Sequence, residues 1–286
     1  MSTLPPEAHL VQAMWSYSTY VLAPARALRE AGVPVTAPPV GDEPVDVPRP
    51  GLGASFSVDR PAPVLLQEPT EHDHLVEEFD RMGEVYDAFV RPFSEPIFAE
   101  ALDVMRAWIA PDARVLDAGC GAGRELRSVA RLVPDGEVVG IDLAAGMVNA
   151  ASLAARSHGL DNTAFFQSDV GSLPEAFTEQ FDIAYNCLAH HHYPDPPRAA
   201  AEILRCLRPG GVYCIVDPGP KWFTALASPL AAWADPGWIR FHTPAQFREL
   251  LGAAGFARTG WRELLPGFGL ATGQKRPHQA GGRARE

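Results

Sequence analysis

The sequence contains few cysteines, and none of them is paired in a motif typical of metal binding or redox chemistry. Its four cysteines lie at positions 120, 187, 206 and 214, and no two of them form a CxxC motif. This spacing gives no support to a disulfide framework or a cysteine-based zinc site. Three of the four lie in or beside apolar runs, which is typical of buried free thiols. We therefore expect a protein of the reducing cytoplasm.

Positive charge and long apolar runs are also scarce. The chain has 24 Lys and Arg against 35 Asp and Glu, a net charge of -11, and only Lys221 and Lys275 are lysines. An acidic protein without a basic patch repels phosphate backbones and anionic membranes. The apolar stretch 10–23 is interrupted by polar residues and has no basic segment before it, so neither a signal peptide nor a membrane span is indicated. We expect no nucleic-acid or membrane partner, and the excess of Arg over Lys with abundant Ala indicates bacterial coding bias.

Three regions of different composition divide the chain. Residues 5–31 carry apolar side chains at helical spacing, and nine prolines follow within residues 33–69. We expect residues 1–70 to form a helical, Pro-rich extension that acts as a lid or as the contact of a homodimer. Residues 71–276 then form the main domain, and the polar, Gly-rich residues 277–286 form a disordered tail.

The main domain alternates between short β-rich runs and helical segments. Helical periodicity covers residues 72–90 and 95–109, and the β-rich runs are 113–118, 137–142, 163–168, 181–187 and 211–217. Such βαβ spacing requires a parallel sheet with helices on both faces. Residues 256–264 and 268–276 are separated by only three residues and predict an antiparallel hairpin. The fold class is therefore α/β, a doubly wound, seven-stranded, mostly parallel sheet with a C-terminal antiparallel hairpin and an N-terminal helical extension.

A cluster of glycines follows the first predicted strand in "VLDAGCGAG", residues 115–123. Turns at the carboxyl ends of parallel strands bind ligands, and glycine lets the backbone approach a ligand closely. The dinucleotide pattern GxGxxG/A fails because Arg124 stands where Gly or Ala is needed, and no GK[ST] of a P-loop follows. The pattern is D-x-G-x-G-x-G instead, so the cluster predicts a ligand loop of another kind.

A carboxylate lies at the end of the next predicted strand. Asp142 follows Gly123 by 19 residues, a position suited to binding both hydroxyls of a ribose. Asp142 could instead simply cap the following helix. Asp117, the first residue of the D-x-G-x-G-x-G pattern, could likewise be a helix cap or part of a turn rather than a ligand-binding residue. Asp169, within "SD" before a loop, is the least specific of the three.

In this order the motifs resemble those of the class I S-adenosylmethionine-dependent methyltransferases, over about residues 75–276. The glycine segment resembles the first motif of that family, "VVGIDLAAGMV" the second and "FQSDVGSLP" the third. "FDIAYNCLAHHHYPDPPRAAAEILRCLRPGG" resembles the fourth, as found in the small-molecule branch that includes quinone-biosynthesis enzymes. The resemblance implies a Rossmann-like fold, S-adenosylmethionine as the cofactor and a small molecule as the methyl acceptor.

The resemblance also implies a role for individual residues. Asp142 would bind the ribose, Leu143 and Met147 would pack on the adenine, Asp169 and Val170 would read its edge, and Asp117 would face the ammonium group. Asn186 and Cys187 would line the methionine end, and Tyr86 could offer an aromatic face to the sulfonium. The complete predicted cofactor site is Tyr86, Asp117, Gly119, Cys120, Gly121, Gly123, Asp142, Leu143, Met147, Asp169, Val170, Asn186 and Cys187.

Three consecutive histidines follow the fourth predicted strand. His190, His191 and His192 allow three interpretations: structural loop residues, a general base or substrate hydrogen-bond donor, or a metal site. The metal interpretation is weak because neighbouring rings diverge and Asp195 is the only carboxylate nearby. His191 and His190 are the catalytic candidates, and no metal is expected. "DPPR" at 195–198 ends in Arg198 rather than an aromatic residue, which argues against a nucleic-acid base as the acceptor.

An aromatic segment separates the fifth strand from the hairpin. Residues 217–244 include Trp222, Phe223, Trp233, Trp238 and Phe241, which could roof an apolar acceptor pocket or form a helical packing layer. Both interpretations favour a hydrophobic or aromatic small molecule of secondary metabolism, with methylation at O, N or C left open. Two alternatives remain: an enzyme of this fold that uses the cofactor for a non-methyl transfer or a rearrangement, and a noncatalytic partner subunit.

Overall fold

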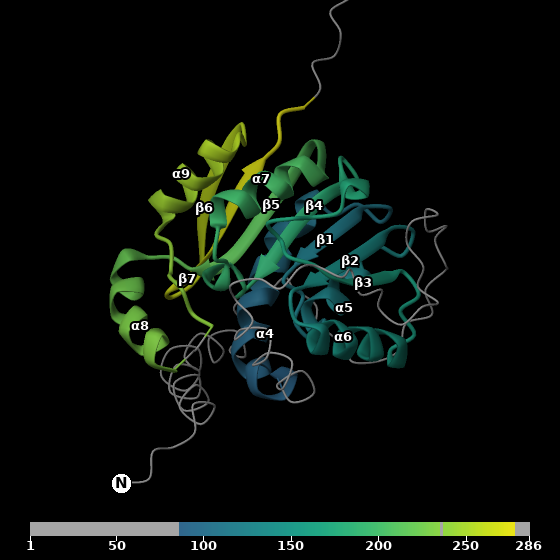
Figure 1. The fold of residues 1–286 in the computed structure, drawn as a ribbon, viewed down its shortest axis with the longest axis horizontal. Helices are drawn as coiled ribbons and strands as arrows, with labels where there is room; N and C mark the ends of the chain where they lie inside the picture. Colours follow the sequence, from purple (N-terminus) through teal and green to yellow (C-terminus); the bar gives the residue numbers. More distant parts are fainter. Residues whose placement is uncertain (1–85, 235–236, 278–286) are drawn as a thin grey trace, which may run out of the picture.

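The computed structural model describes residues 86–234 and 237–277. These residues form a seven-stranded sheet with helices on both faces (Figure 1). The strand order is β3-β2-β1-β4-β5-β7-β6. The elements are α4 (Tyr86–Met105), η2 (Arg106–Trp108), β1 (Arg114–Ala118), α5 (Arg124–Ala130), β2 (Glu137–Asp142), α6 (Ala145–Ser157), β3 (Thr163–Gln167), η3 (Glu175–Phe177), β4 (Phe181–Cys187), η4 (His190–His192), α7 (Pro196–Cys206), β5 (Leu207–Pro218), α8 (Lys221–Ala234), α9 (Pro244–Ala254), β6 (Arg258–Leu265) and β7 (Phe268–Gln274).

The first five strands are parallel and the last two are antiparallel. β1 pairs in parallel with both β2 and β4, β2 with β3, and β4 with β5. β7 pairs antiparallel with β5 on one side and with β6 on the other. The chain winds outward from β1 to β3 and then crosses to β4, so the order reverses between β1 and β4, where sheets of this kind bind their ligands. The predicted doubly wound, mostly parallel α/β sheet with its C-terminal antiparallel hairpin is confirmed.

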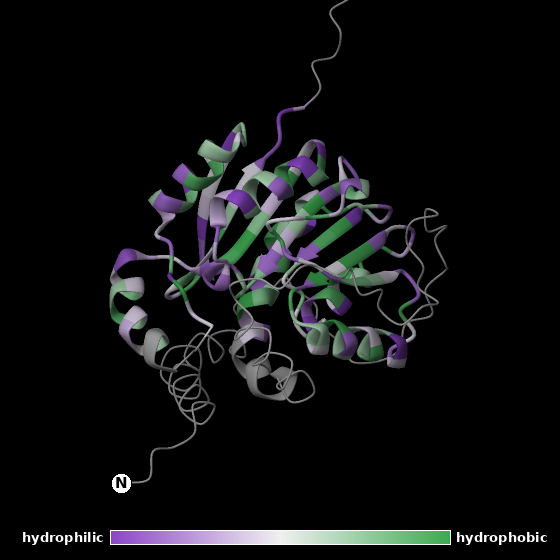
Figure 2. Ribbon diagram, viewed as in Figure 1, coloured by the Kyte–Doolittle hydropathy of each residue, from purple (hydrophilic) through white to green (hydrophobic). Residues whose placement is uncertain are grey.

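Alternation along the strands supplies a core on each face of the sheet. Val115 of β1 packs in one cluster, below α4, α5 and α6, whereas its neighbour Leu116 packs in the other, below α7 and α9. Figure 1 shows these two helix layers on opposite sides of the strands, and Figure 2 shows the apolar colouring of the central strands between them. Both faces of the central strands are therefore buried, as the nearly continuous apolar runs require.

The helix before the sheet differs from the prediction. Instead of separate helices over 72–90 and 95–109, α4 runs unbroken from Tyr86 to Met105 and passes through Pro92 and Pro96, with η2 after it. Its residues Ile97, Ala101 and Met105 are fully buried against the sheet. Burial of this face outweighs the local cost of a proline inside a helix.

The strand ends shift slightly, and some predictions lie outside the described residues. β5 begins at Leu207 rather than at 211, because Leu207 already pairs with Phe181 of β4. The predicted extension 1–70, the start of the main domain and the tail from 278 onward lie outside the described ranges. Within those ranges, no helix is both long enough and apolar enough to cross a membrane.

Candidate active site

A pocket opens at the carboxyl ends of β1 to β4, at the point where the strand order reverses. Its walls come from the glycine loop after β1, the ends of β2 and β3, and the segment after β4. Of the predicted cofactor residues, those that line it are Asp117, Gly119, Cys120, Gly121, Asp142, Leu143, Met147, Asp169, Val170 and Cys187. The fold therefore brings residues from four strand ends to one cavity.

The glycine loop is held by β2 and by its own backbone conformation. The amides of Gly119 and Cys120 both donate to the carbonyl oxygen of Ile141, at 2.8 and 2.9 Å. Gly119 and Gly123 have φ values of 89° and 75°, a region that favours glycine. Gly123 does not line the pocket; a Cβ there would lie 2.8 Å from the Cβ of Ala151 in α6. This glycine therefore makes room for a neighbouring helix rather than for a ligand.

Asp142 ties the glycine loop to the start of α6. One carboxylate oxygen accepts a hydrogen bond from the amide of Gly121 at 2.9 Å, and the other accepts one from the amide of Ala144 at 3.0 Å. Each carboxylate oxygen has capacity for a further donor. Asp142 is not the N-cap of α6, because that position is Ala144 and it has no side-chain cap. The carboxylate instead fixes the turn before the helix, and it still faces the pocket with oxygen atoms able to accept ligand hydroxyls.

Asp117 is a buried carboxyl group at the floor of the pocket. The hydroxyl of Tyr185, from β4, donates to it at 2.7 Å, and only 2% of Asp117 is exposed. Burial raises the pKa of Asp117 well above its usual value, and the hydrogen bond from Tyr185 opposes this only in part. A cation placed against this carboxyl group would stabilise its ionised form.

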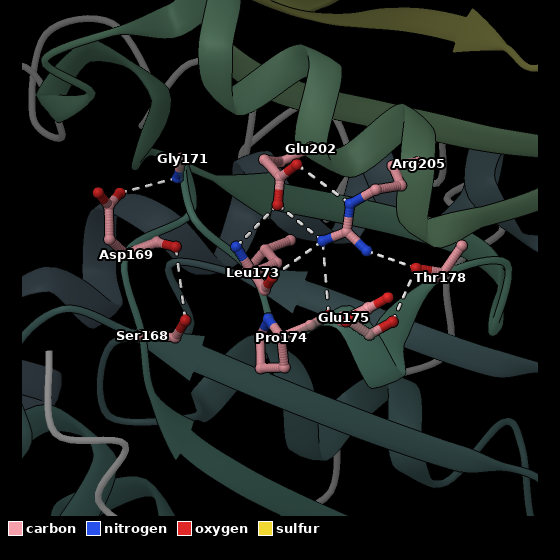
Figure 3. A network of polar contacts seen from close by, with 9 residues as sticks. All are labelled: Ser168, Asp169, Gly171, Leu173, Pro174, Glu175, Thr178, Glu202 and Arg205. Carbon is pink, nitrogen blue, oxygen red and sulfur yellow. Dashed lines mark hydrogen bonds and ion pairs between the residues drawn. The ribbon is translucent and has the colours of Figure 1, made fainter.

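The loop after β3 is braced by an ion pair from α7. Asp169 accepts a hydrogen bond from the amide of Gly171 at 2.7 Å. Further along the loop, Glu202 accepts from the amide of Leu173 at 2.9 Å, while Arg205 bonds both Glu202 and the carbonyl oxygen of Leu173 (Figure 3). Because these contacts fix the loop at its far end, Asp169 and Val170 keep their place at the pocket wall.

Two predicted cofactor residues do not contribute a described side chain to the pocket. Asn186 is fully buried, and its amide nitrogen donates to the hydroxyls of Tyr193 and Tyr213 at 3.2 and 2.7 Å. The prediction that it lines the methionine end is therefore wrong in its placement; the direction of alternate residues in β4 points Cys187, not Asn186, to the cavity. Tyr86 begins α4, and its side chain lies outside the described part.

The three histidines take three different environments. His190 is buried against Tyr193, His242 and Phe247 and does not line the pocket, and burial holds its pKa well below the usual value. This position does not fit the catalytic role predicted for it. The Nδ1 atom of His191 lies 2.7 Å from Asp217, and neither residue lines the pocket. Only His192 does.

No cluster of three or more potential metal ligands occurs within residues 86–234 and 237–277.

The pocket also contains residues that sequence reasoning did not single out. Tyr193 lines it and donates to the carbonyl oxygen of Ala118 at 2.7 Å, directly before the glycine loop. Ser94 of α4 and Glu125 of α5 line it as well. A single sequence carries no signal for Ser94, because it reaches the cavity only through the packing of α4 on the sheet.

Comparison with known proteins agrees with this arrangement. A family model described as a methyltransferase domain matches residues 109–240. Over 208 residues, the chain is 36% identical to the nocamycin O-methyltransferase of Saccharothrix syringae, covering 65% of this chain and 72% of that protein. It is 32% identical to the trans-aconitate 2-methyltransferase of Deinococcus radiodurans over 165 residues, which cover 56% of this chain and 58% of that protein.

A solved structure shows the same fold. The DhpI–SAH complex superposes with a TM-score of 0.57 at 26% identity, covering 73% of this chain and all of that one. The chain belongs to the S-adenosylmethionine-dependent methyltransferases, as its motifs indicated, and S-adenosylmethionine is its cofactor. The observed pocket fits that cofactor: carboxyl groups stand at its floor and rim, and Leu143 and Met147 form an apolar wall.

Proposed function

We propose that this methyltransferase transfers the methyl group to an oxygen atom of a small, apolar or aromatic metabolite. The observation that carries the proposal is the pocket at the reversal of strand order, where the carboxyl groups of four residues and an apolar wall meet. The names of the two relatives, a nocamycin and a trans-aconitate methyltransferase, support a small molecule as the acceptor.

The chain's own residues would hold the cofactor by complementary chemistry. Asp142 would accept the hydrogen bonds of the ribose hydroxyls, and Asp117 would face the ammonium group. Leu143 and Met147 would pack on the adenine, with Asp169 and Val170 at its edge. When bound, the cofactor supplies a methyl group on a positively charged sulfur, so orientation of the acceptor contributes more than acid or base strength.

The setting of the enzyme is also part of the proposal. We infer a cytoplasmic protein, because Cys120, Cys206 and Cys214 are buried free thiols, and burial raises the pKa of Cys206 to about 12. Such thiols favour a reducing compartment. The homodimer expected through residues 1–70 lies outside the described residues and stays a prediction.

The cofactor assignment is tested at Asp142. Asp142→Ala should weaken binding of S-adenosylhomocysteine at least about tenfold, since charge-assisted hydrogen bonds are worth roughly 1.5–3 kcal/mol each. Calorimetric titration measures the affinity, and the melting temperature shows whether the variant is folded.

Asp135→Ala is the matched control, because Asp135 is an exposed carboxylate that does not line the pocket. It removes the same charge and should leave affinity unchanged. A folded Asp142→Ala protein that binds as tightly as the wild type would contradict the assignment of Asp142 to the ribose.

A further inference from the structure

A network of three buried polar side chains lies beside the cofactor pocket. It consists of Asn186 in β4, Tyr193 directly after η4, and Tyr213 in β5. The side-chain nitrogen of Asn186 lies 3.2 Å from the hydroxyl oxygen of Tyr193 and 2.7 Å from that of Tyr213. Asn186 and Tyr213 are fully buried, and only 6% of Tyr193 is exposed. Of the three residues, Tyr193 alone lines the pocket.

The hydroxyl of Tyr193 extends this network to the main chain at the start of the glycine loop. It lies 2.7 Å from the carbonyl oxygen of Ala118, the last residue of β1. Because a carbonyl oxygen can only accept, the single hydroxyl proton of Tyr193 points to Ala118. The hydroxyl oxygen must then accept its second bond, so the nitrogen and not the oxygen of the Asn186 amide faces it. The donors therefore run in one direction, from Asn186 through Tyr193 to Ala118.

The bond from Tyr193 reaches β1 on the side where pairing within the sheet ends first. β1 pairs with β2 up to Ala118, but its pairing with β4 ends one residue earlier, at Asp117. On the β2 side, the carbonyl oxygen of Ile141 also accepts hydrogen bonds from two amides of the glycine loop. On the β4 side, the hydroxyl of Tyr193 supplies a hydrogen bond directly after the last pair of the ladder. The loop is therefore held from both neighbouring strands.

Close packing brings the segment after β4 against the same loop. At Gly119, whose φ is 89°, an added Cβ would lie 2.8 Å from the Cβ of Ala189 and 3.7 Å from the hydroxyl oxygen of Tyr193. Gly119 therefore leaves room for this segment, as Gly123 does for α6. Gly119, Ala189 and Tyr193 all line the pocket, so the contact between the two segments is part of the pocket wall.

Stability alone does not explain the network. The side-chain oxygen of Asn186 is buried and has no hydrogen-bond partner within residues 86–234 and 237–277. An unpaired buried acceptor is unfavourable, whereas apolar side chains of similar shape at the three positions would avoid that cost. Burial raises the pKa of Tyr193 and of Tyr213, so both hydroxyls keep their protons. Polar groups that are retained at such a cost are expected where they serve a binding site.

We propose that Tyr193 is a positioning residue for the cofactor: its hydroxyl fixes the end of β1, and with it the glycine loop, in the conformation that binds S-adenosylmethionine. Asn186 orients the hydroxyl of Tyr193 and acts on the site through it, without lining the pocket. Because the loop is ordered before the cofactor arrives, binding does not have to supply the free energy of ordering it. The proposal depends on the cofactor and not on which atom of the acceptor is methylated.

The test compares two substitutions in the full-length chain, each of which removes one buried hydroxyl from Asn186. Tyr193→Phe also removes the bond to Ala118, and it should weaken binding of S-adenosylhomocysteine about three- to tenfold, the equivalent of one hydrogen bond. Tyr213→Phe is the matched control: it removes the same atom from a residue that does not line the pocket, and its affinity should equal that of the wild type. Calorimetric titration measures the affinities. Both variants should melt a few degrees below the wild type, so a difference in stability does not explain a difference in affinity.

Backbone amide spectra give a second readout. The signals of Gly119 and Gly121 should shift in Tyr193→Phe and stay in place in Tyr213→Phe, since only the first variant loses a contact with the start of the loop. Unchanged affinity in Tyr193→Phe, or an equal loss in both variants, would overturn the proposal, because the network would then be structural. A wild type that does not bind S-adenosylhomocysteine would overturn the cofactor assignment itself, so the two failures are distinguished.

Discussion

Asp117 shows how a single side chain can be unfavourable for the empty protein and favourable for the complex. The carboxyl group is buried beside Asp142 and Glu125, whose charges raise its pKa further, and Tyr185 alone stabilises its ionised form through a hydrogen bond. Ionisation without a cation nearby is therefore costly. The ammonium group of the cofactor would supply that missing charge.

Cofactor affinity should therefore depend on pH through Asp117. Because the pKa of Asp117 is raised, the carboxylate becomes protonated as the pH falls toward that value, and attraction to an ammonium group is lost. Affinity for S-adenosylhomocysteine should fall as the pH is lowered from the alkaline side. Calorimetric titration at a series of pH values measures this.

Variants of Asp117 and Tyr185 show whether Asp117 causes the pH dependence of affinity. Asp117→Asn should bind weakly at every pH and should flatten the dependence. Tyr185→Phe removes the donor that opposes the raised pKa, so the loss of affinity should begin at higher pH. Equal pH dependence in the wild type and in Asp117→Asn would show that another group is responsible.

Among the elements, the junction of β1, the glycine loop and α5 depends on close packing with α6. Gly123 has a positive φ, and α5 begins directly after it. A Cβ atom at Gly123 would lie 2.8 Å from the Cβ of Ala151, which leaves no room for a methyl group. A side chain here would both strain the backbone and push α6, which carries Met147, away from the loop.

Gly123→Ala should accordingly lower the free energy of unfolding by about 1–3 kcal/mol. It should also weaken cofactor binding, although Gly123 does not line the pocket. Denaturant unfolding and calorimetry measure the two effects.

Gly252→Ala is the control, and it should change the free energy of unfolding in the opposite direction. Gly252 lies inside α9, and a Cβ there meets nothing within 4 Å. The variant should be more stable than the wild type by about 0.4–1 kcal/mol, through lower entropy of the unfolded chain. If Gly123→Ala were equally harmless, the packing of α6 would not set the shape of the loop.

For the molecule as a whole, the described residues contain a complete two-layered core. Both helix layers and all seven strands lie within 86–277, and the two main core clusters are formed there. We therefore propose that residues 71–276 are an autonomous cofactor-binding domain and that residues 1–70 serve acceptor binding or association.

Removal of residues 1–70 should leave cooperative unfolding and affinity for S-adenosylhomocysteine nearly unchanged. It should change the Michaelis constant for an acceptor, or the mass in solution, if the segment is a lid or a dimer contact. Thermal unfolding, calorimetry and light scattering separate these outcomes. Loss of cofactor binding in a folded, shortened protein would show that the segment belongs to the cofactor site.

Local patterns predicted the sheet well because each strand can be recognised from its own residues. The ranges of β2 and β4 agree with the prediction to the residue, since both are apolar runs bounded by loops. The predicted gap between residues 90 and 95 was wrong because helical periodicity is a local signal, whereas the burial of Ile97 and Ala101 depends on a sheet that follows later in the chain.

By itself the sequence determined the carboxyl ends of the parallel strands to within about one residue, the glycine loop and three of the carboxyl groups around the pocket. In a parallel sheet these features are fixed by position: a residue directly after a strand reaches the same edge in every βα unit. Asp117, Asp142 and Asp169 were found in this way, and all three line the cavity.

Only the tertiary structure decided which histidine faces which neighbour. Consecutive residues of a short 3-10 helix project about 120° apart. His190, His191 and His192 therefore enter a buried cluster, a hydrogen bond with Asp217 and the pocket wall, respectively. Asp217 lies 26 residues beyond His191 on another strand. The sequence could not pair them, because that contact exists only once β4 and β5 lie side by side.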